Sequence, residues 1–159
     1  MNKHKTKMLF LFSILTLLFI ALDQFTKHLA ILHLKEKESV PLLQGVLELH
    51  YLENKGAAFG MLQGQKAFIL FVGVVFLAVV LFCLIKLPDK KKFDPLYYIV
   101  ATMTAGGIGN MIDRIRFDYV VDFIYFSLID FPIFNVADIC VTLSVIALIV
   151  VVMFVYKED

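Results

Sequence analysis

The sequence contains few charged residues and few of the residues that build metal or disulfide sites. Of its 159 residues only 18% are charged and the net charge is +1, so no basic footprint for nucleic acid is visible. The two cysteines, Cys83 and Cys140, both lie in apolar runs, where we expect small buried apolar side chains rather than a disulfide framework. The four histidines form no HExxH or CxxC…H pattern, so we expect neither a metal site nor a cofactor.

Apolar residues, by contrast, make up 60% of the chain. Soluble domains contain roughly 45–50%. A helix crosses a bilayer with ~20 apolar residues, and four stretches are long enough: residues 8–32, 67–87, 96–112 and 136–156. We therefore expect an all-α membrane protein with four transmembrane helices. No repeat or Ser/Gly linker divides the chain, so residues 1–159 are expected to form a single domain.

The placement of lysine predicts the direction of these stretches. The segment NKHKTK precedes the first stretch, and the short loop PDKKKFDP joins the second to the third. Lysine-rich segments of this kind stay on the cytoplasmic side, so both termini are expected to be cytoplasmic and segments 33–66 and 113–135 to lie outside. A cleaved signal peptide is the alternative interpretation of the first stretch, but its apolar run is long and no A-x-A site follows it.

The two outer segments contain strand-like patterns. VLELHYLE, residues 46–53, alternates in the manner of a half-buried strand, and DYVVDFIYF, residues 118–126, is rich in β-branched and aromatic residues. These patterns predict a small β-like platform with loops on the extracytoplasmic face.

Polar residues within three of the apolar stretches lie at similar depths. With ~1.5 Å of rise per residue, Asp23, Asn110 and Asp138 lie about 22 Å, about 21 Å and about 27 Å from the cytoplasmic edge. Polar groups are costly in hydrocarbon, so this convergence indicates a site near the outer leaflet. Structural interpretations are also open: Asp23 with Lys27 matches an interface ion pair, and Asp138 matches a helix N-terminal acid with Asn135 as the cap.

The third stretch carries small residues on one face. Ala101, Ala105 and Gly109 form a row that would let another helix approach closely. The neighbouring Asp113 and Arg114 match an anchor at the end of a helix.

Two carboxylates are candidates for catalysis. Asp138 opens the last stretch, and Asp122 lies in the apolar segment VVDFI, where burial is costly without a partner. If the chain folds Asp122 back over the helices, the two can share a proton and activate water as in aspartic proteases. No GxSxG motif surrounds any serine. Asp118 and Asp130 remain alternatives to Asp122.

A small membrane transporter or channel subunit is the alternative function, because intramembrane polar groups also mark ion paths. A path needs polar groups through the full thickness of the bilayer. The second stretch has nothing polar between Phe68 and Cys83.

Five short motifs give a more specific indication when they are taken in order. They are DQFTK at 23–27, NKGAAFG at 54–60, GGIGNMIDR at 106–114, VVDFI at 120–124 and FNVAD at 134–138. In this order the chain resembles, over nearly its whole length, the lipoprotein signal peptidases (signal peptidase II), which are bacterial membrane aspartyl peptidases. The resemblance implies Asp122 and Asp138 as the catalytic pair, and it is the VVDFI match that chooses Asp122.

The resemblance further implies an endopeptidase of the bacterial cytoplasmic membrane with its active site near the outer leaflet. Its substrates would be diacylglyceryl-modified prolipoproteins, cleaved on the N-terminal side of the lipidated cysteine, and we expect it to act as a monomer among membrane lipids. The implied substrate-binding residues are Asn54, Asn110, Arg114 and Asn135. We expect Asp23, Lys27, Gly56 and Gly109 to support the site, and the NKGAAFG segment, with Gly56 and Gly60, to form a cradle or lid.

Overall fold

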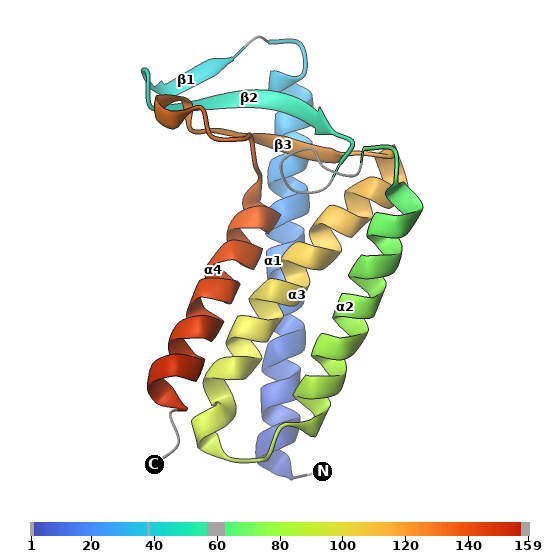
Figure 1. Cartoon of the computed structure of the whole chain (residues 1–159), viewed down its shortest axis with the longest axis vertical. Helices are drawn as coiled ribbons and strands as arrows, with labels where there is room; N and C mark the ends of the chain where they lie inside the picture. Colours follow the sequence, from blue (N-terminus) through green and yellow to red (C-terminus); the bar gives the residue numbers. More distant parts are fainter. Residues whose placement is uncertain (1, 38, 57–62, 157–159) are drawn as a thin grey trace.

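The structure, a computed structural model, describes residues 2–37, 39–56 and 63–156. In these residues four long helices run side by side, and a small sheet lies across one end of them (Figure 1). The helices are α1 (Lys3–Leu34), α2 (Lys66–Lys86), α3 (Asp94–Phe117) and α4 (Val136–Val150), which continues into a π-helical turn, η4 (Val151–Val155). The strands are β1 (Val40–Leu43), β2 (Leu47–Asn54) and β3 (Val120–Tyr125), and two short 3-10 helices are η2 (Lys91–Phe93) and η3 (Ser127–Ile129).

Each predicted apolar stretch coincides with a helix. Within the described residues, three helices are long and apolar enough to cross a membrane: Lys3–Leu34, Lys66–Lys86 and Val136–Val155. Helix α3 covers the predicted stretch 96–112 but is not among these three. It packs against α1, α2 and α4, and most of its buried residues are alanine, glycine or threonine. Its lower hydrophobicity therefore reflects contact with helices rather than with lipid.

The sheet has the order β1-β2-β3, and both neighbouring pairs are antiparallel. Strands β2 and β3 confirm the patterns at 46–53 and 118–126. Strand β1 was not predicted, because four residues are too few to show an alternating pattern. In the register of β2 with β3, Leu52 pairs with Asp122 and Asn54 with Val120, so Asn54 and Asp122 lie close together.

The chain after η3 returns to β3 before it enters α4. The Phe134 carbonyl accepts from the Ile124 amide at 2.8 Å, and the Phe134 amide donates to the Ile124 carbonyl at 3.0 Å. This isolated bridge holds the FNVAD segment alongside VVDFI. It is the physical reason that the start of α4 lies next to Asp122.

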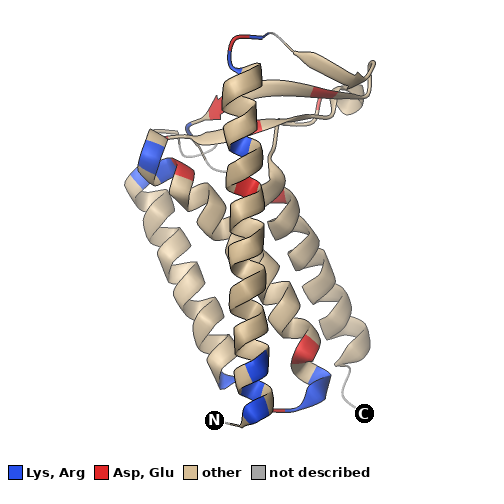
Figure 2. Ribbon diagram, turned by 180° about the vertical axis from the view of Figure 1, so that it is seen from behind, with Lys and Arg blue, Asp and Glu red and all other residues tan. Residues whose placement is uncertain are grey.

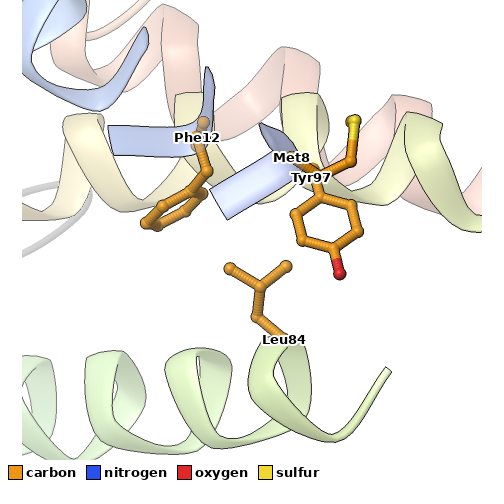
Figure 3. Packing of buried hydrophobic residues seen from close by; sticks show 5 residues of the cluster. Met8, Phe12, Leu84 and Tyr97 are labelled. Carbon is orange, nitrogen blue, oxygen red and sulfur yellow. The ribbon is translucent and has the colours of Figure 1, made fainter. Parts of the chain in front are cut away.

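Two apolar clusters hold the ends of the molecule. At the end far from the sheet, Leu84 of α2 faces Phe12 of α1 and Tyr97 of α3 (Figure 3). Beneath the sheet, Val121 and Phe123 pack with the last turns of α1. The second cluster fixes β3, and with it Asp122, over the helices.

The expectation for the cysteines is half correct. Cys140 is buried, but Cys83 is exposed on α2, so its expected burial is wrong. Within the described residues α2 buries only Leu84, because α2 packs chiefly against α3 and leaves its other faces open.

The close approach expected on α3 is confirmed. A Cβ atom at Gly106 would collide with the carbonyl oxygen of Ala137 and lie 2.8 Å from the Val141 side chain. A Cβ atom at Gly109 would collide with the carboxylate of Asp23. Helices α1 and α4 therefore approach α3 to a distance that only glycine permits at these positions.

We predict that Gly106→Ala destabilises the protein, because its methyl group would meet backbone atoms of α4 that cannot move aside. Overpacking of this kind costs about 1–3 kcal/mol. Gly107→Ala is the matched control, since its methyl group would lie 3.7 Å from Leu77 in ordinary contact. Thermal unfolding in detergent should separate the two variants, and equal stability would contradict the packing argument.

Candidate active site

A single buried ammonium group organises the site. Lys27 is 2% exposed, and its Nζ lies 3.0 Å from Asp23 Oδ2 and 3.0 Å from Asp113 Oδ2. The same Nζ donates to Asn110 Oδ1 at 2.9 Å. A lysine ammonium has three donors, so each of them has an acceptor here. The expected ion pair of Asp23 with Lys27 is thus confirmed as part of a larger network.

The two carboxylates of this network also bind backbone and amide donors. The Ala137 amide of α4 donates to Asp23 Oδ1 at 3.0 Å, and the Val121 amide of β3 donates to Asp113 Oδ2 at 3.0 Å. Gln24 Nε2 donates to Asp113 Oδ1 at 2.9 Å. The network therefore joins α1, α3, α4 and β3.

Sequence reasoning did not assign Asp113 and Gln24 to this network. The pattern of Asp113 beside Arg114 predicts a helix-end anchor, whereas Asp113 is buried and paired with Lys27. The signal that could have found it is the number of donors on Lys27. A buried ammonium has three N–H donors, and Asp23 alone does not satisfy all of them.

From Lys27 the hydrogen bonds continue to Asp138. Asn110 presents its oxygen to Lys27 and donates from Nδ2 to Asp138 Oδ1 at 2.8 Å. Asn135 Nδ2 donates to Asn110 Oδ1 at 3.1 Å. The chain of contacts thus runs from the buried ammonium to one of the two candidate carboxylates.

Asn135 and Asp138 also form the N-terminal cap of α4. The Asp138 amide donates to Asn135 Oδ1 at 3.0 Å, and the Asn135 amide donates to Asp138 Oδ2 at 3.1 Å. This reciprocal capping box confirms the capping interpretation. It does not compete with a chemical role, because it fixes the Asp138 carboxylate at the positive end of the helix dipole.

Asp122 lies on β3 and is 1% exposed. Its oxygens accept from Asn135 Nδ2 at 2.6 Å and from Asn54 Nδ2 at 2.9 Å. Burial, together with the nearby charge of Asp138, raises the pKa of Asp122 to about 7. Asn135 thus contacts both carboxylates.

The two acidic alternatives to Asp122 lie elsewhere. Asp118 pairs with Lys66 at 2.5 Å, and its side chain is 78% exposed. Asp130 accepts from the Tyr125 hydroxyl at 2.6 Å and is exposed. The geometry therefore brings Asp122, and neither alternative, to the site of Asp138.

A cavity of about 630 Å³ opens over these residues, at the junction of the helices and the sheet. Its polar lining residues are Asn54, Asn110, Arg114, Asp122, Asp138 and Thr142. Its remaining wall is apolar and comes from Val120 of β3, from residues 131–134 and from α4. A volume of roughly 300–1,000 Å³ is usual for small-ligand sites.

Two of the expected site residues take positions behind the cavity rather than in it. Asn135 is 0% exposed, so direct contact with substrate is not supported, and its contacts make it a positioning residue. Gly56 is buried, and its carbonyl accepts from Arg114 Nη2 at 2.7 Å. Residues 57–60, including Gly60, lie outside the described residues, so the expected cradle or lid stays a prediction. Among the residues that the structure describes, no group of three or more His, Cys, Asp or Glu side chains could hold a metal ion.

Comparison with known proteins assigns the family. The family model of signal peptidase (SPase) II matches residues 15–154. The chain belongs to the signal peptidase II family. A lipoprotein signal peptidase of Caldanaerobacter subterraneus subsp. tengcongensis is 44% identical over 130 residues, which cover 81% of this chain and 86% of that one. A lipoprotein signal peptidase of Streptococcus thermophilus is 40% identical over 140 residues, 88% of each chain.

Two solved structures share the fold of this signal peptidase II. Both are bacterial membrane enzymes determined by the in meso method. The first, at 2.3 Å resolution, has a TM-score of 0.82 and 28% identity, and the match covers 93% of this chain and 92% of that one. The second, at 1.9 Å, has a TM-score of 0.78 and 29% identity over 90% and 92% of the two chains. The chain is therefore an aspartic peptidase of a bacterial membrane, and the transporter alternative is wrong.

We predict that Lys27→Met destabilises this peptidase strongly, because two buried carboxylates would lose their cation. Breaking a buried pair costs about 3–5 kcal/mol. Lys66→Met is the control, since its partner Asp118 is exposed and such pairs contribute about 0–1 kcal/mol. Thermal unfolding of both variants in detergent provides the measurement. If Lys27→Met unfolds no earlier than Lys66→Met, the network is not a structural centre.

Proposed function

We propose that this signal peptidase II cleaves prolipoproteins on the N-terminal side of the diacylglyceryl-modified cysteine, with Asp122 and Asp138 as the catalytic pair. The observation that carries the proposal is the pair of carboxylates that line one cavity and share Asn135. Carboxylates placed in this way hold one proton between them, which supplies a base and an acid at neutral pH.

The raised pKa of Asp122 supports a division of roles. Asp138, ionised, takes a proton from water as the water oxygen attacks the carbonyl carbon of the scissile bond. Asp122, protonated, donates its proton to the carbonyl oxygen, which gives a neutral tetrahedral diol. The diol then returns a proton to Asp122 as the carbon–nitrogen bond breaks, and the departing amine takes the proton held by Asp138. Both carboxyl groups end as they began.

Other lining residues supply contacts for the substrate. Arg114 uses Nη1 on the Asn110 carbonyl and Nη2 on the Gly56 carbonyl, so part of its five-donor guanidinium remains for the peptide backbone. The Asn110 amide, held by Lys27, faces the cavity beside Arg114. Apolar side chains of α4, including Ile139 and Leu143, form a wall suited to acyl chains or to an apolar signal segment.

We further propose that α3 is a fourth membrane span in a single domain that acts as a monomer, with both termini cytoplasmic and the sheet outside. Support comes from the charges, since Lys and Arg gather at the N-terminal end of α1 and on the loop between α2 and α3, opposite the sheet (Figure 2). Excess Lys and Arg marks the cytoplasmic side. Residues 157–159, at the C-terminus, lie outside the described part of the chain. This arrangement puts the cavity at the outer leaflet, where a diacylglyceryl cysteine holds its peptide bond.

We predict that Asp122→Asn and Asp138→Asn each lower the cleavage rate of lipid-modified prolipoprotein by more than about a hundredfold, since each removes one proton-transfer group. Asp118→Asn and Asp130→Asn are the controls and should cleave at nearly the rate of the unaltered protein. A gel assay separating precursor from cleaved product measures all four variants. Full activity in either of the first two would eliminate the dyad.

We also predict that the rate falls as pH rises through about 7, because Asp122 must hold its proton to act as the acid. Asn54→Leu removes a hydrogen bond that lowers the pKa of Asp122. In this variant the fall in rate should therefore occur at higher pH. The measurement is the pH at which kcat, determined at saturating substrate, falls to half of its maximum. This pH can be compared between variants whose maximal rates differ. A rate that stays constant to pH 9 would contradict the assignment of the proton to Asp122.

A further inference from the structure

A second cavity, of about 500 Å³, opens beside the first. It is lined by residues 52–55 at the end of β2, by Gln63, and by the turn at Pro132 and Ile133. We call it the second pocket. Its volume lies within the roughly 300–1,000 Å³ that is usual for ligand sites.

The second pocket adjoins the first cavity, which we call the catalytic cavity. Asn54, Pro132 and Ile133 line both, and Asn54 donates to Asp122. A peptide laid across the two carboxylates can therefore extend past Asn54 into the second pocket. One cavity would then hold the residues on one side of the scissile bond, and the other cavity the residues on the other side.

The lining of the two cavities differs in a way that sets the direction of the peptide. The catalytic cavity includes α4 residues 138–139 and 141–143 and residues of α3, whereas the described residues that line the second pocket come from the end of β2 and from loops. A signal segment is apolar and stays beside the membrane helices. The chain that follows the cysteine is released to water, so it leaves over the polar loops.

We propose that the second pocket binds the residues immediately C-terminal to the lipidated cysteine and makes the enzyme selective at that position. The proposal rests on the proposed peptidase function and names a part of the substrate that the enzyme discriminates. The ligand is a short polar peptide segment that begins at the new N-terminus of the product.

The charges around the second pocket predict which side chains it favours. Glu53 lies 3.0 Å from Lys35 Nζ and accepts from the Tyr51 hydroxyl at 3.2 Å, so its negative charge is compensated. Lys55 is exposed and has no ion pair among the described residues. The uncompensated charge at the pocket is therefore positive, and an acidic residue after the cysteine is preferred over a basic one.

The test compares two lipid-modified prolipoprotein substrates that differ only in the residue after the cysteine, aspartate in one and lysine in the other. An exposed ion pair changes binding by about 1.4- to fivefold. In the unaltered protein, kcat/KM for the aspartate substrate should exceed that for the lysine substrate by a factor in this range. Lys55→Glu should invert the ratio, and Lys55→Met should bring it close to one. The ratio does not depend on the fraction of enzyme that is folded.

Lys37→Glu is the matched control, because it makes the same change of charge at an exposed lysine that lines neither cavity. Its ratio should equal that of the unaltered protein. If Lys37→Glu shifts the ratio as much as Lys55→Glu does, or if no variant shifts it, the pocket does not select and the inference is overturned. If the unaltered protein cleaves neither substrate, the proposed peptidase function fails first and the inference fails with it.

Discussion

The fold depends on one buried cation. Removing an ammonium from water costs several kcal/mol, and the interior recovers that cost only when every donor finds an acceptor. Lys27 satisfies this condition with Asp23, Asp113 and Asn110. The carboxylates in turn require the backbone amides of Ala137 and Val121. Two helices, the start of a third and a strand must therefore be in place together, so the network selects one arrangement of the chain.

The same cation fixes which way two amide groups point. A side-chain amide has an oxygen end and a nitrogen end, and only the oxygen can face an ammonium. Because Asn110 turns its oxygen to Lys27, its nitrogen must face Asp138. Asn135 then turns its nitrogen to Asn110 and Asp122, and its oxygen caps α4. Lys27 touches neither Asp122 nor Asp138. It nevertheless sets the orientation of the amide donors that both carboxylates receive.

Much of this arrangement can be predicted from the sequence, and the exceptions have physical causes. Long apolar runs give the helices, and two alternating or β-branched runs give β2 and β3. The common depth of Asp23, Asn110 and Asp138 indicates one site, and the structure brings the three into one network. The meeting of Asp122 with Asp138 could not be derived from local pattern, because it depends on a bridge between Ile124 and Phe134 that joins segments separated by a turn. It is the VVDFI motif of the family, and not periodicity, that pairs Asp122 with Asp138.

The first turns of α4 combine two requirements that usually conflict. A polar site needs ordered donors, while a wall against lipid needs apolar side chains. Helix geometry separates them, because Asn135 and Asp138 share one face of the first turn and Ile139 lies about 100° further round the helix from Asp138. The capping box uses the polar pair to begin the helix, which leaves the following residues free to be apolar. The Asp138 carboxylate can therefore be held beside apolar side chains, since the hydrogen bonds that hold it are those that a helix start requires in any case.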